Sequence, residues 1–142
     1  ACTVAMAVAQ ISDSPKAAAG RCPKPRILII DDEPFLLEML ERYLGRLAAV
    51  DAVGSGQAAA HLVRRHRYDV AVVDLRLGRD DGIDVVEALL RQQPRCIGAV
   101  VFHTGVTPMP QPPLGVVVPH VVVSKGDLRG LKQAVQSRLG VR

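Results

Sequence analysis

The stretch Ile27-Leu28-Ile29-Ile30-Asp31-Asp32 places two carboxylates directly after a run of four aliphatic residues. A short, continuous run of β-branched and aliphatic residues is typical of a strand buried on both faces. Carboxylates at the end of such a run lie at the carboxyl edge of the sheet. This edge is where open α/β sheets place their binding sites.

The same arrangement recurs three times along the chain. Asp74 directly follows the apolar run Val70–Val73, whereas Thr104 and Lys125 stand one residue beyond the runs Ile97–Phe102 and Val121–Val123. If these strands are parallel, all five polar side chains gather at one edge. The sequence therefore predicts a site built from three carboxylates, one hydroxyl and one amine.

Helical patterns separate the predicted strands. Asp32 can cap a helix with Pro34 in its first turn and an apolar stripe at Leu36, Leu40, Leu44 and Leu47. Further helices are expected over Gln57–Arg67 after a Ser55 or Gly56 cap, over Ile83–Gln92, and from about Asp127 with a stripe at Leu128, Leu131, Val135 and Leu139. Strands alternating with helices indicate an α/β fold with a doubly wound five-stranded parallel sheet and right-handed crossovers.

Four further local features are expected. A short strand is expected over Ala48–Val53 and another from about Ile97 to His103, while the polar segment Leu75–Asp81 is predicted to be a loop. Gly82 is expected at a sharp turn that needs an unusual backbone angle.

The pattern changes after Gly105, where five prolines occur between residues 108 and 119. Proline costs about 3 kcal/mol inside a helix. We therefore expect the fourth helix of the doubly wound fold to be degenerate or replaced by a proline-rich loop that leads to a strand over Val121–Ser124.

Length and composition agree with one domain. The chain has 142 residues, of which 49% are hydrophobic and 3% aromatic, and its net charge is +4. We assign residues 1–24 to an N-terminal arm or linker and residues 25–142 to the domain. The basic residues are dispersed, and their densest cluster, around Arg64, Arg65 and Arg67, is interpreted as a solvated face. No nucleic-acid or membrane partner is expected, and three cysteines without metal spacing fit a cytoplasmic protein.

Three neighbouring carboxylates oppose one another's ionisation unless a cation is present. Magnesium prefers such hard oxygen ligands. We expect Asp31, Asp32, Asp74 and the main-chain carbonyl of Arg76 to hold Mg²⁺. Asp74, at the tip of the central strand, is the best placed to become an aspartyl phosphate, with Thr104 and Lys125 binding phosphoryl oxygens.

Taken in order, these motifs resemble the receiver domain of two-component response regulators. The likeness runs from about Pro25 to Leu139 and includes Asp31-Asp32-Glu33, Asp74-Leu75-Arg76-Leu77, Asp81-Gly82-Ile83 and Ser124-Lys125. The resemblance implies the flavodoxin-like strand order 2-1-3-4-5. It also implies a phosphoacceptor rather than an enzyme, supplied by a sensor histidine kinase or a histidine phosphotransfer protein and acting on a downstream signalling protein in a phosphorelay.

Departures from the common receiver pattern suggest a subgroup. Val122 stands where many receivers have an aromatic switch residue, and Gly126 replaces the usual proline after the lysine. Phe102-His103-Thr104-Gly105-Val106 resembles the motif of the "FAT GUY" receivers, a mostly single-domain subgroup that signals through protein contacts.

Three alternatives stay open at the level of sequence. The domain is a degenerate receiver that binds a protein without phosphorylation, a phosphatase with an aspartyl-phosphate intermediate, or a fragment of a larger protein. Arg76 argues against the phosphatase, because a second acid is expected two residues after the nucleophile.

Overall fold

The computed structural model describes residues 24–105 and 114–140, and these contain a five-stranded parallel sheet. Its order is β2-β1-β3-β6-β7. The strands are β1 (Arg26–Ile30), β2 (Ala49–Val53), β3 (Val70–Val73), β6 (Val100–Thr104) and β7 (His120–Ser124). Counting only these five strands, the order is 2-1-3-4-5, which confirms the predicted doubly wound fold.

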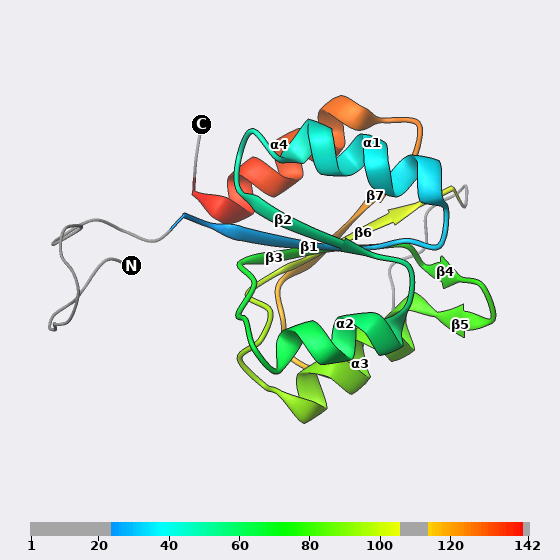
Figure 1. Cartoon of the computed structure of the whole chain (residues 1–142), viewed down its shortest axis with the longest axis vertical. Helices are drawn as coiled ribbons and strands as arrows, with labels where there is room; N and C mark the ends of the chain where they lie inside the picture. The colour runs from blue at the N-terminus through cyan, green and yellow to red at the C-terminus, as the bar shows by residue number, and fades with distance from the viewer. Residues whose placement is uncertain (1–23, 106–113, 141–142) are drawn as a thin grey trace, which may run out of the picture.

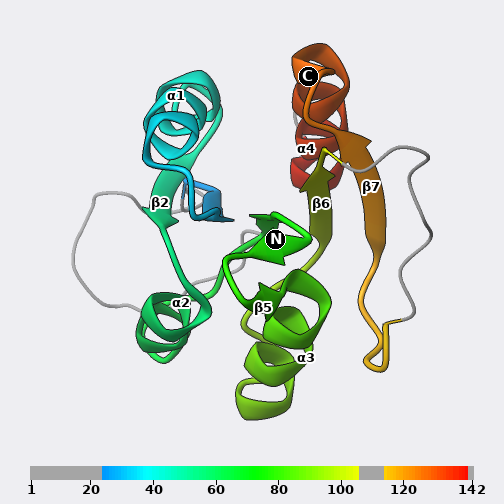
Figure 2. The ribbon, with the colours of Figure 1, turned by 90° about the vertical axis from the view of Figure 1, so that its right-hand side faces the viewer.

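Helices cover both faces of the sheet. The helices α1 (Pro34–Leu44) and α4 (Leu128–Leu139) lie on one face, and α2 (Gly56–Val63) and α3 (Gly82–Gln92) lie on the other (Figure 1). Figure 2 looks onto the carboxyl edge, with β2 on the left and β7 on the right. Because the helices cover the two faces of the sheet, the side chains at the strand ends meet at this edge.

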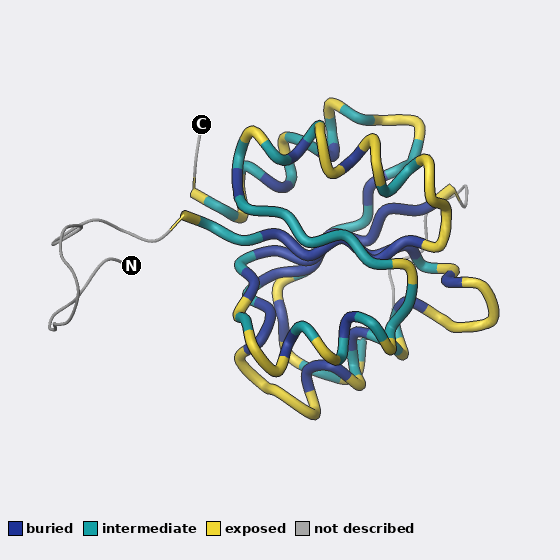
Figure 3. Tube along the Cα trace, in the orientation of Figure 1, coloured by how far each residue is buried: buried dark blue, intermediate teal, exposed yellow. Residues whose placement is uncertain are grey.

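The alternation of side chains along each strand divides the core in two. Ile27 and Ile29 pack toward α1 and α4 with Leu40 and Leu131. Leu28 and Ile30 belong to the cluster that α2 and α3 cover. The central strands are therefore buried on both sides, and the buried trace runs through the middle of the molecule in Figure 3. This explains why the sequence shows continuous apolar runs instead of alternation.

The strand register aligns the ends of the strands. Ile30 pairs with Val73, Val73 pairs with Phe102, and Thr104 pairs with Ser124. The residues that follow β1 and β3 therefore emerge at the same level, and Lys125 follows β7 two residues farther along the sheet. The predicted gathering of polar groups at one edge is a direct result of this register.

Two helix boundaries differ from the predictions. Asp32 does not cap α1, because Glu33 is the N-cap residue, and no side chain of residues 24–105 or 114–140 caps this helix. Instead, the Asp31 carboxylate accepts a hydrogen bond from the Glu33 N–H at 3.0 Å. Helix α2 has the predicted Ser55 cap, with Ser55 Oγ accepting from the Ala58 N–H, but it ends at Val63 rather than at Arg67. It ends early because the chain must turn to bury Tyr68, which is 0% exposed.

The segment predicted to be a polar loop forms a small hairpin. Strands β4 (Arg76–Leu77) and β5 (Asp80–Asp81) pair antiparallel, and Gly78 at their turn has a φ of 62°. The expectation of an unusual backbone angle at Gly82 was wrong, because Gly82 is the first residue of α3. Glycine is needed there for space, since a Cβ atom would collide with the main-chain carbonyl of Asp74.

Strand β6 starts three residues later than predicted. Ile97 forms only an isolated bridge to Tyr68, and the regular ladder begins at Val100. No helix occurs in residues 114–119, which agrees with a degenerate fourth helix. The other residues of the proline-rich segment, 106–113, and residues 1–23 of the predicted arm lie outside the described residues.

Candidate functional site

Three carboxylates meet at the carboxyl edge of the sheet. Asp31 and Asp32 follow β1, and Asp74 follows β3. One carboxylate oxygen from each lies within 4.8 Å of those of the other two. Asp31 is 1% exposed and Asp74 is 6% exposed, whereas Asp32 is exposed to solvent. The cluster is thus a partly buried acidic site with one open side.

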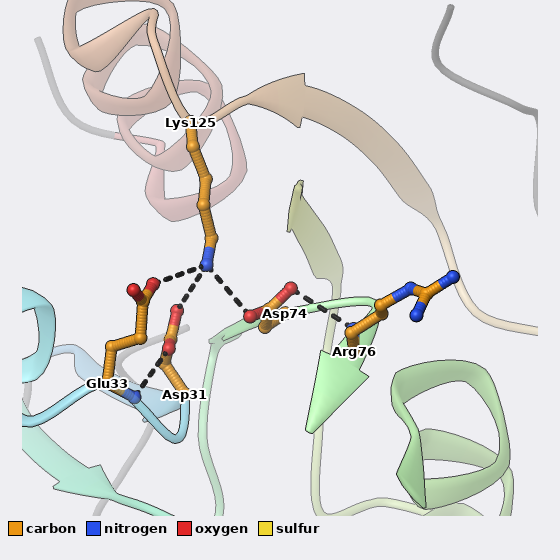
Figure 4. A network of polar contacts seen from close by, with 5 residues as sticks. All are labelled: Asp31, Glu33, Asp74, Arg76 and Lys125. Atoms are coloured by element: carbon orange, nitrogen blue, oxygen red, sulfur yellow. Dashed lines mark hydrogen bonds and ion pairs between the residues drawn. The ribbon is translucent and has the colours of Figure 1, made fainter. Parts of the chain in front are cut away.

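Lys125 reaches the acidic cluster from the end of β7, the edge strand of the sheet. Its Nζ atom lies 2.8 Å from Asp74 Oδ2, 3.3 Å from Asp31 Oδ2 and 3.0 Å from Glu33 Oε1 (Figure 4). The lysine follows β7, and its own N–H donates to the carbonyl oxygen of Thr104 at 2.8 Å. One ammonium group therefore balances part of the charge of three carboxylates.

Main-chain amides orient the two buried carboxylates. The Arg76 N–H donates to Asp74 Oδ1 at 3.1 Å, as the Glu33 N–H does to Asp31 Oδ1. Each carboxylate thereby has one oxygen held by the backbone and the other directed toward Lys125 (Figure 4). The amides fix the orientation of the carboxylates without neutralising their charge.

Burial and charge shift the protonation of this cluster. Burial raises the pKa of Asp31, and the nearby Asp74 charge adds to that effect, against the Glu33 amide and Lys125. Burial alone would lower the pKa of Lys125, but hydrogen bonds to Asp74 and Glu33 outweigh it and raise the pKa. The lysine is therefore charged throughout the physiological range, while the acidic pocket has a net shortage of positive charge.

The donor set fits a divalent cation. Hard carboxylate oxygens on Asp31, Asp32 and Asp74 are the ligands that Mg²⁺ prefers, and one lysine does not balance three acids. The structure brings together all three carboxylates that the sequence singled out. It places Arg76 beside Asp74 through the amide N–H, and the ligand role of its carbonyl stays a prediction.

The hydroxyl residue occupies the expected strand end. Thr104 is the last residue of β6, is 1% exposed, and pairs in register with Ser124, the residue before Lys125. Its place at the same edge as Asp74 is therefore established. Its role as a partner of the phosphoryl group stays a prediction.

Sequence reasoning missed two residues near the site. Glu33 was quoted in the motif Asp31-Asp32-Glu33 but given no role in the site, yet it binds Lys125, and its position directly after two aspartates was the available signal. His103 was quoted only as part of the motif around Thr104, but it is 1% exposed and near enough to Lys125 and Asp74 for their charges to affect its pKa. Side chains alternate along β6, so His103 and Thr104 lie on opposite faces of the sheet. Asp74 lies on the same face as His103.

Curated relatives match about half of this chain. An uncharacterised response regulatory protein of Vibrio cholerae is 40% identical over 81 residues, which cover 54% of this chain and 30% of the relative. The transcriptional regulatory protein TcrA of Mycobacterium tuberculosis is 38% identical over 80 residues, covering 56% of this chain and 32% of the relative. The matched stretch thus spans about a third of these relatives.

Solved structures share the fold of this chain. A CheY-like receiver domain from Methylobacillus flagellatus has a TM-score of 0.69 and 24% identity, covering 82% of this chain and 99% of its own. The response regulator TrrA of Thermotoga maritima, solved with magnesium and beryllium fluoride, has a TM-score of 0.64 and 21% identity. The match covers 80% of this chain and 98% of the TrrA chain. Within residues 24–105 and 114–140, no helix is both long and apolar enough to cross a membrane.

The family model of the response regulator receiver domain matches residues 27–111. This range begins in β1 and includes Asp31, Asp32, Asp74 and Thr104. It covers more than half of the 142 residues. The chain therefore belongs to the response regulator receiver domain family of two-component signalling.

Proposed function

We propose that this domain accepts a phosphoryl group on Asp74. The observation that carries the proposal is the contact of 2.8 Å between Asp74 Oδ2 and the Lys125 ammonium, beside two further aspartates. An acceptor oxygen is here paired with a cation that can bind a phosphoryl oxygen. Phosphoryl transfer depends mainly on such positioning and charge neutralisation.

The transfer step needs no redox chemistry. An Asp74 carboxylate oxygen attacks the phosphorus of a phosphohistidine, so that a P–O bond forms and the P–N bond breaks. The leaving imidazole keeps the electron pair and takes a proton from solvent. Lys125 moves its hydrogen bonds to the phosphoryl oxygens, and the hydroxyl of Thr104 becomes a second donor to them.

Magnesium completes the proposed site. Asp31, Asp32 and Asp74 would hold it, with the Arg76 carbonyl as a further ligand, and it would supply charge neutralisation for the phosphoryl oxygens. The raised pKa of Asp31, which results mainly from burial, supports this assignment, because a buried carboxylate is stabilised by an added cation.

Partners follow from the same chemistry. The phosphodonor is a sensor histidine kinase or a histidine phosphotransfer protein; among the structural neighbours, TrrA of Thermotoga maritima has been solved in complex with the histidine kinase ThkA. We propose a phosphorelay in the cytoplasm with output through contact with a downstream protein, no direct nucleic-acid binding, and an affinity with the FAT GUY subgroup. Residues 114–119, which have no helix where receivers usually have one, support that subgroup.

The test is incubation with acetyl phosphate and Mg²⁺ followed by intact mass measurement. We expect one labile phosphoryl group on the wild type and none on Asp74→Asn. Asp84→Asn is the matched control, because Asp84 is an exposed acid in the first turn of α3. No mass gain in the wild type, or a gain that persists in Asp74→Asn, would contradict the proposal.

A second candidate is a binding module that works without phosphorylation. Val122 supports it, because this position packs as an aliphatic residue against the core instead of carrying an aromatic switch. Magnesium affinity without any phosphoryl transfer, from acetyl phosphate or from a phosphorylated histidine kinase, would favour this second function.

A further inference from the structure

His103 lies beside the phosphoacceptor position on the sheet. Val73 pairs with Phe102, so the next residues along the two strands, Asp74 and His103, are neighbours. On the other side His103 pairs with Val123 of β7. Val72, Val101 and Val123 belong to the cluster under α1 and α4, and side chains alternate along a strand, so Asp74 and His103 share that face.

The side chain of Lys125 has to cross the end of β6. Lys125 follows β7, whereas its partners Asp74 and Asp31 follow β3 and β1, and β6 lies between β7 and β3. Neighbouring strands are about 4.8 Å apart, so the ammonium spans roughly two strand spacings. Figure 4 shows the lysine extended toward the acids from the end of β7. His103 is the β6 residue on the face that the lysine crosses.

The imidazole of His103 has unused hydrogen-bonding capacity. The residue is 1% exposed, and among the described residues neither Nδ1 nor Nε2 has a hydrogen-bond partner. A buried polar group without a partner is costly and uncommon in native structures. Burial and the Lys125 charge lower the pKa of His103 to about 4, while Asp74 opposes that shift. The ring is therefore neutral at physiological pH, and one of its nitrogens is a free acceptor.

We propose that His103 is a positioning residue for Lys125. When a bound cation draws the Asp31 carboxylate away from Lys125, the unprotonated ring nitrogen of His103 accepts a hydrogen bond from the lysine ammonium. This hydrogen bond keeps the ammonium next to Asp74. The proposal rests on the proposed function of Asp74 as phosphoacceptor. The competing view is that His103 only supports the methylene stem of the lysine, a task that an apolar side chain would perform equally well.

The experiment compares His103→Leu, which keeps an apolar volume but removes both nitrogens, with His103→Gln, which keeps an acceptor. For His103→Leu we expect a higher midpoint of urea unfolding together with a roughly tenfold slower phosphorylation by acetyl phosphate, the effect of losing one hydrogen bond to a charged group. His103→Gln recovers most of the rate. Opposite changes in stability and rate are the signature, because a purely structural residue moves both in the same direction.

Val101→Ala is the matched control. Val101 lies on the same strand and the same face as His103, and shortening it lowers stability without removing a hydrogen-bonding atom. We expect its phosphorylation rate to stay close to that of the wild type. A wild-type rate in His103→Leu, or an equally slow rate in Val101→Ala, would overturn the proposal.

Nitrogen NMR of the wild type provides a test that does not depend on variants. We expect Mg²⁺ alone to shift the resonance of one His103 ring nitrogen, because that nitrogen gains a donor. An unchanged resonance overturns the role of His103 even if Asp74 is phosphorylated normally. A wild type that shows the shift but takes up no phosphoryl group would refute the proposed function of Asp74 and leave the contact between His103 and Lys125 established.

Discussion

The ammonium of Lys125 lies 2.8 Å from the Asp74 carboxylate, although the two residues are 51 positions apart in the sequence. The contact crosses β6, and it closes a network that includes Asp31 and Glu33 (Figure 4). The network holds the acceptor aspartate in place before any phosphodonor binds. It also makes the stability of the domain depend on the charges of the site.

Replacement of Lys125 by methionine removes the only cation in contact with the buried acids among the described residues. Breaking a buried ion pair by removing one partner costs about 3 kcal/mol, and the partial exposure of Lys125 reduces this to roughly 1–2 kcal/mol. We expect urea denaturation to show that loss and phosphorylation by acetyl phosphate to be severely slowed. Arg129→Met, an exposed cation on α4, serves as the control. Equal effects of both substitutions would contradict the network.

Asp31→Asn tests whether the acidic cluster carries an excess of negative charge. The folded-state pKa of Asp31 lies above its ordinary 3.8, mainly because of burial, so the native protein binds this proton more tightly than the unfolded chain. Its contribution to stability therefore declines as the pH rises through that folded pKa. We expect Asn to stabilise the protein at pH 7, with little gain below pH 3.8, and to weaken Mg²⁺ binding measured by calorimetry. A gain that is independent of pH would argue against this explanation.

The stability of the wild type should depend on His103 at acidic pH. The folded-state pKa of about 4 lies below the ordinary value of 6.5, so the unfolded chain binds more protons between these two values. The free energy of unfolding therefore rises with pH across this window by an amount on the order of 3 kcal/mol. It reaches its full value above pH 6.5. Denaturation curves measured from pH 4 to 7 should show this rise in the free energy of unfolding for the wild type and not for His103→Leu. Parallel curves would show that His103 is not buried in its neutral form.

Gly82→Ala tests how closely α3 approaches the acceptor. A Cβ atom at this position would collide with the main-chain carbonyl of Asp74, and overpacking of this kind costs about 1–3 kcal/mol. We expect lower stability in thermal denaturation and slower phosphorylation, because the collision displaces Asp74 itself. Gly54→Ala is the control, since a Cβ atom there meets its nearest neighbour at an ordinary 3.8 Å. Normal phosphorylation of Gly82→Ala would show that the acceptor tolerates the displacement.

The errors of the sequence-based predictions share a physical cause. Asp31 accepts the Glu33 N–H instead of Asp32 capping the helix, α2 ends four residues early, and the segment around Gly78 forms a hairpin. Each depends on which of several competing local hydrogen bonds the packed structure favours. Propensity and periodicity detect the elements themselves, but they do not choose among such local alternatives.

By itself, the sequence determined the α/β class, the five strands, their order through the family resemblance, and the polar residues that meet at the carboxyl edge. Apolar runs of strand length and strand-end polar residues are local patterns, so they can be read without coordinates. Only the tertiary structure decided that Lys125 crosses β6 to reach Asp74, that Glu33 joins the network, and that the buried ring of His103 has no hydrogen-bond partner within the described part of the chain. These relationships arise from the pairing register and from burial, which depend on residues distant in sequence.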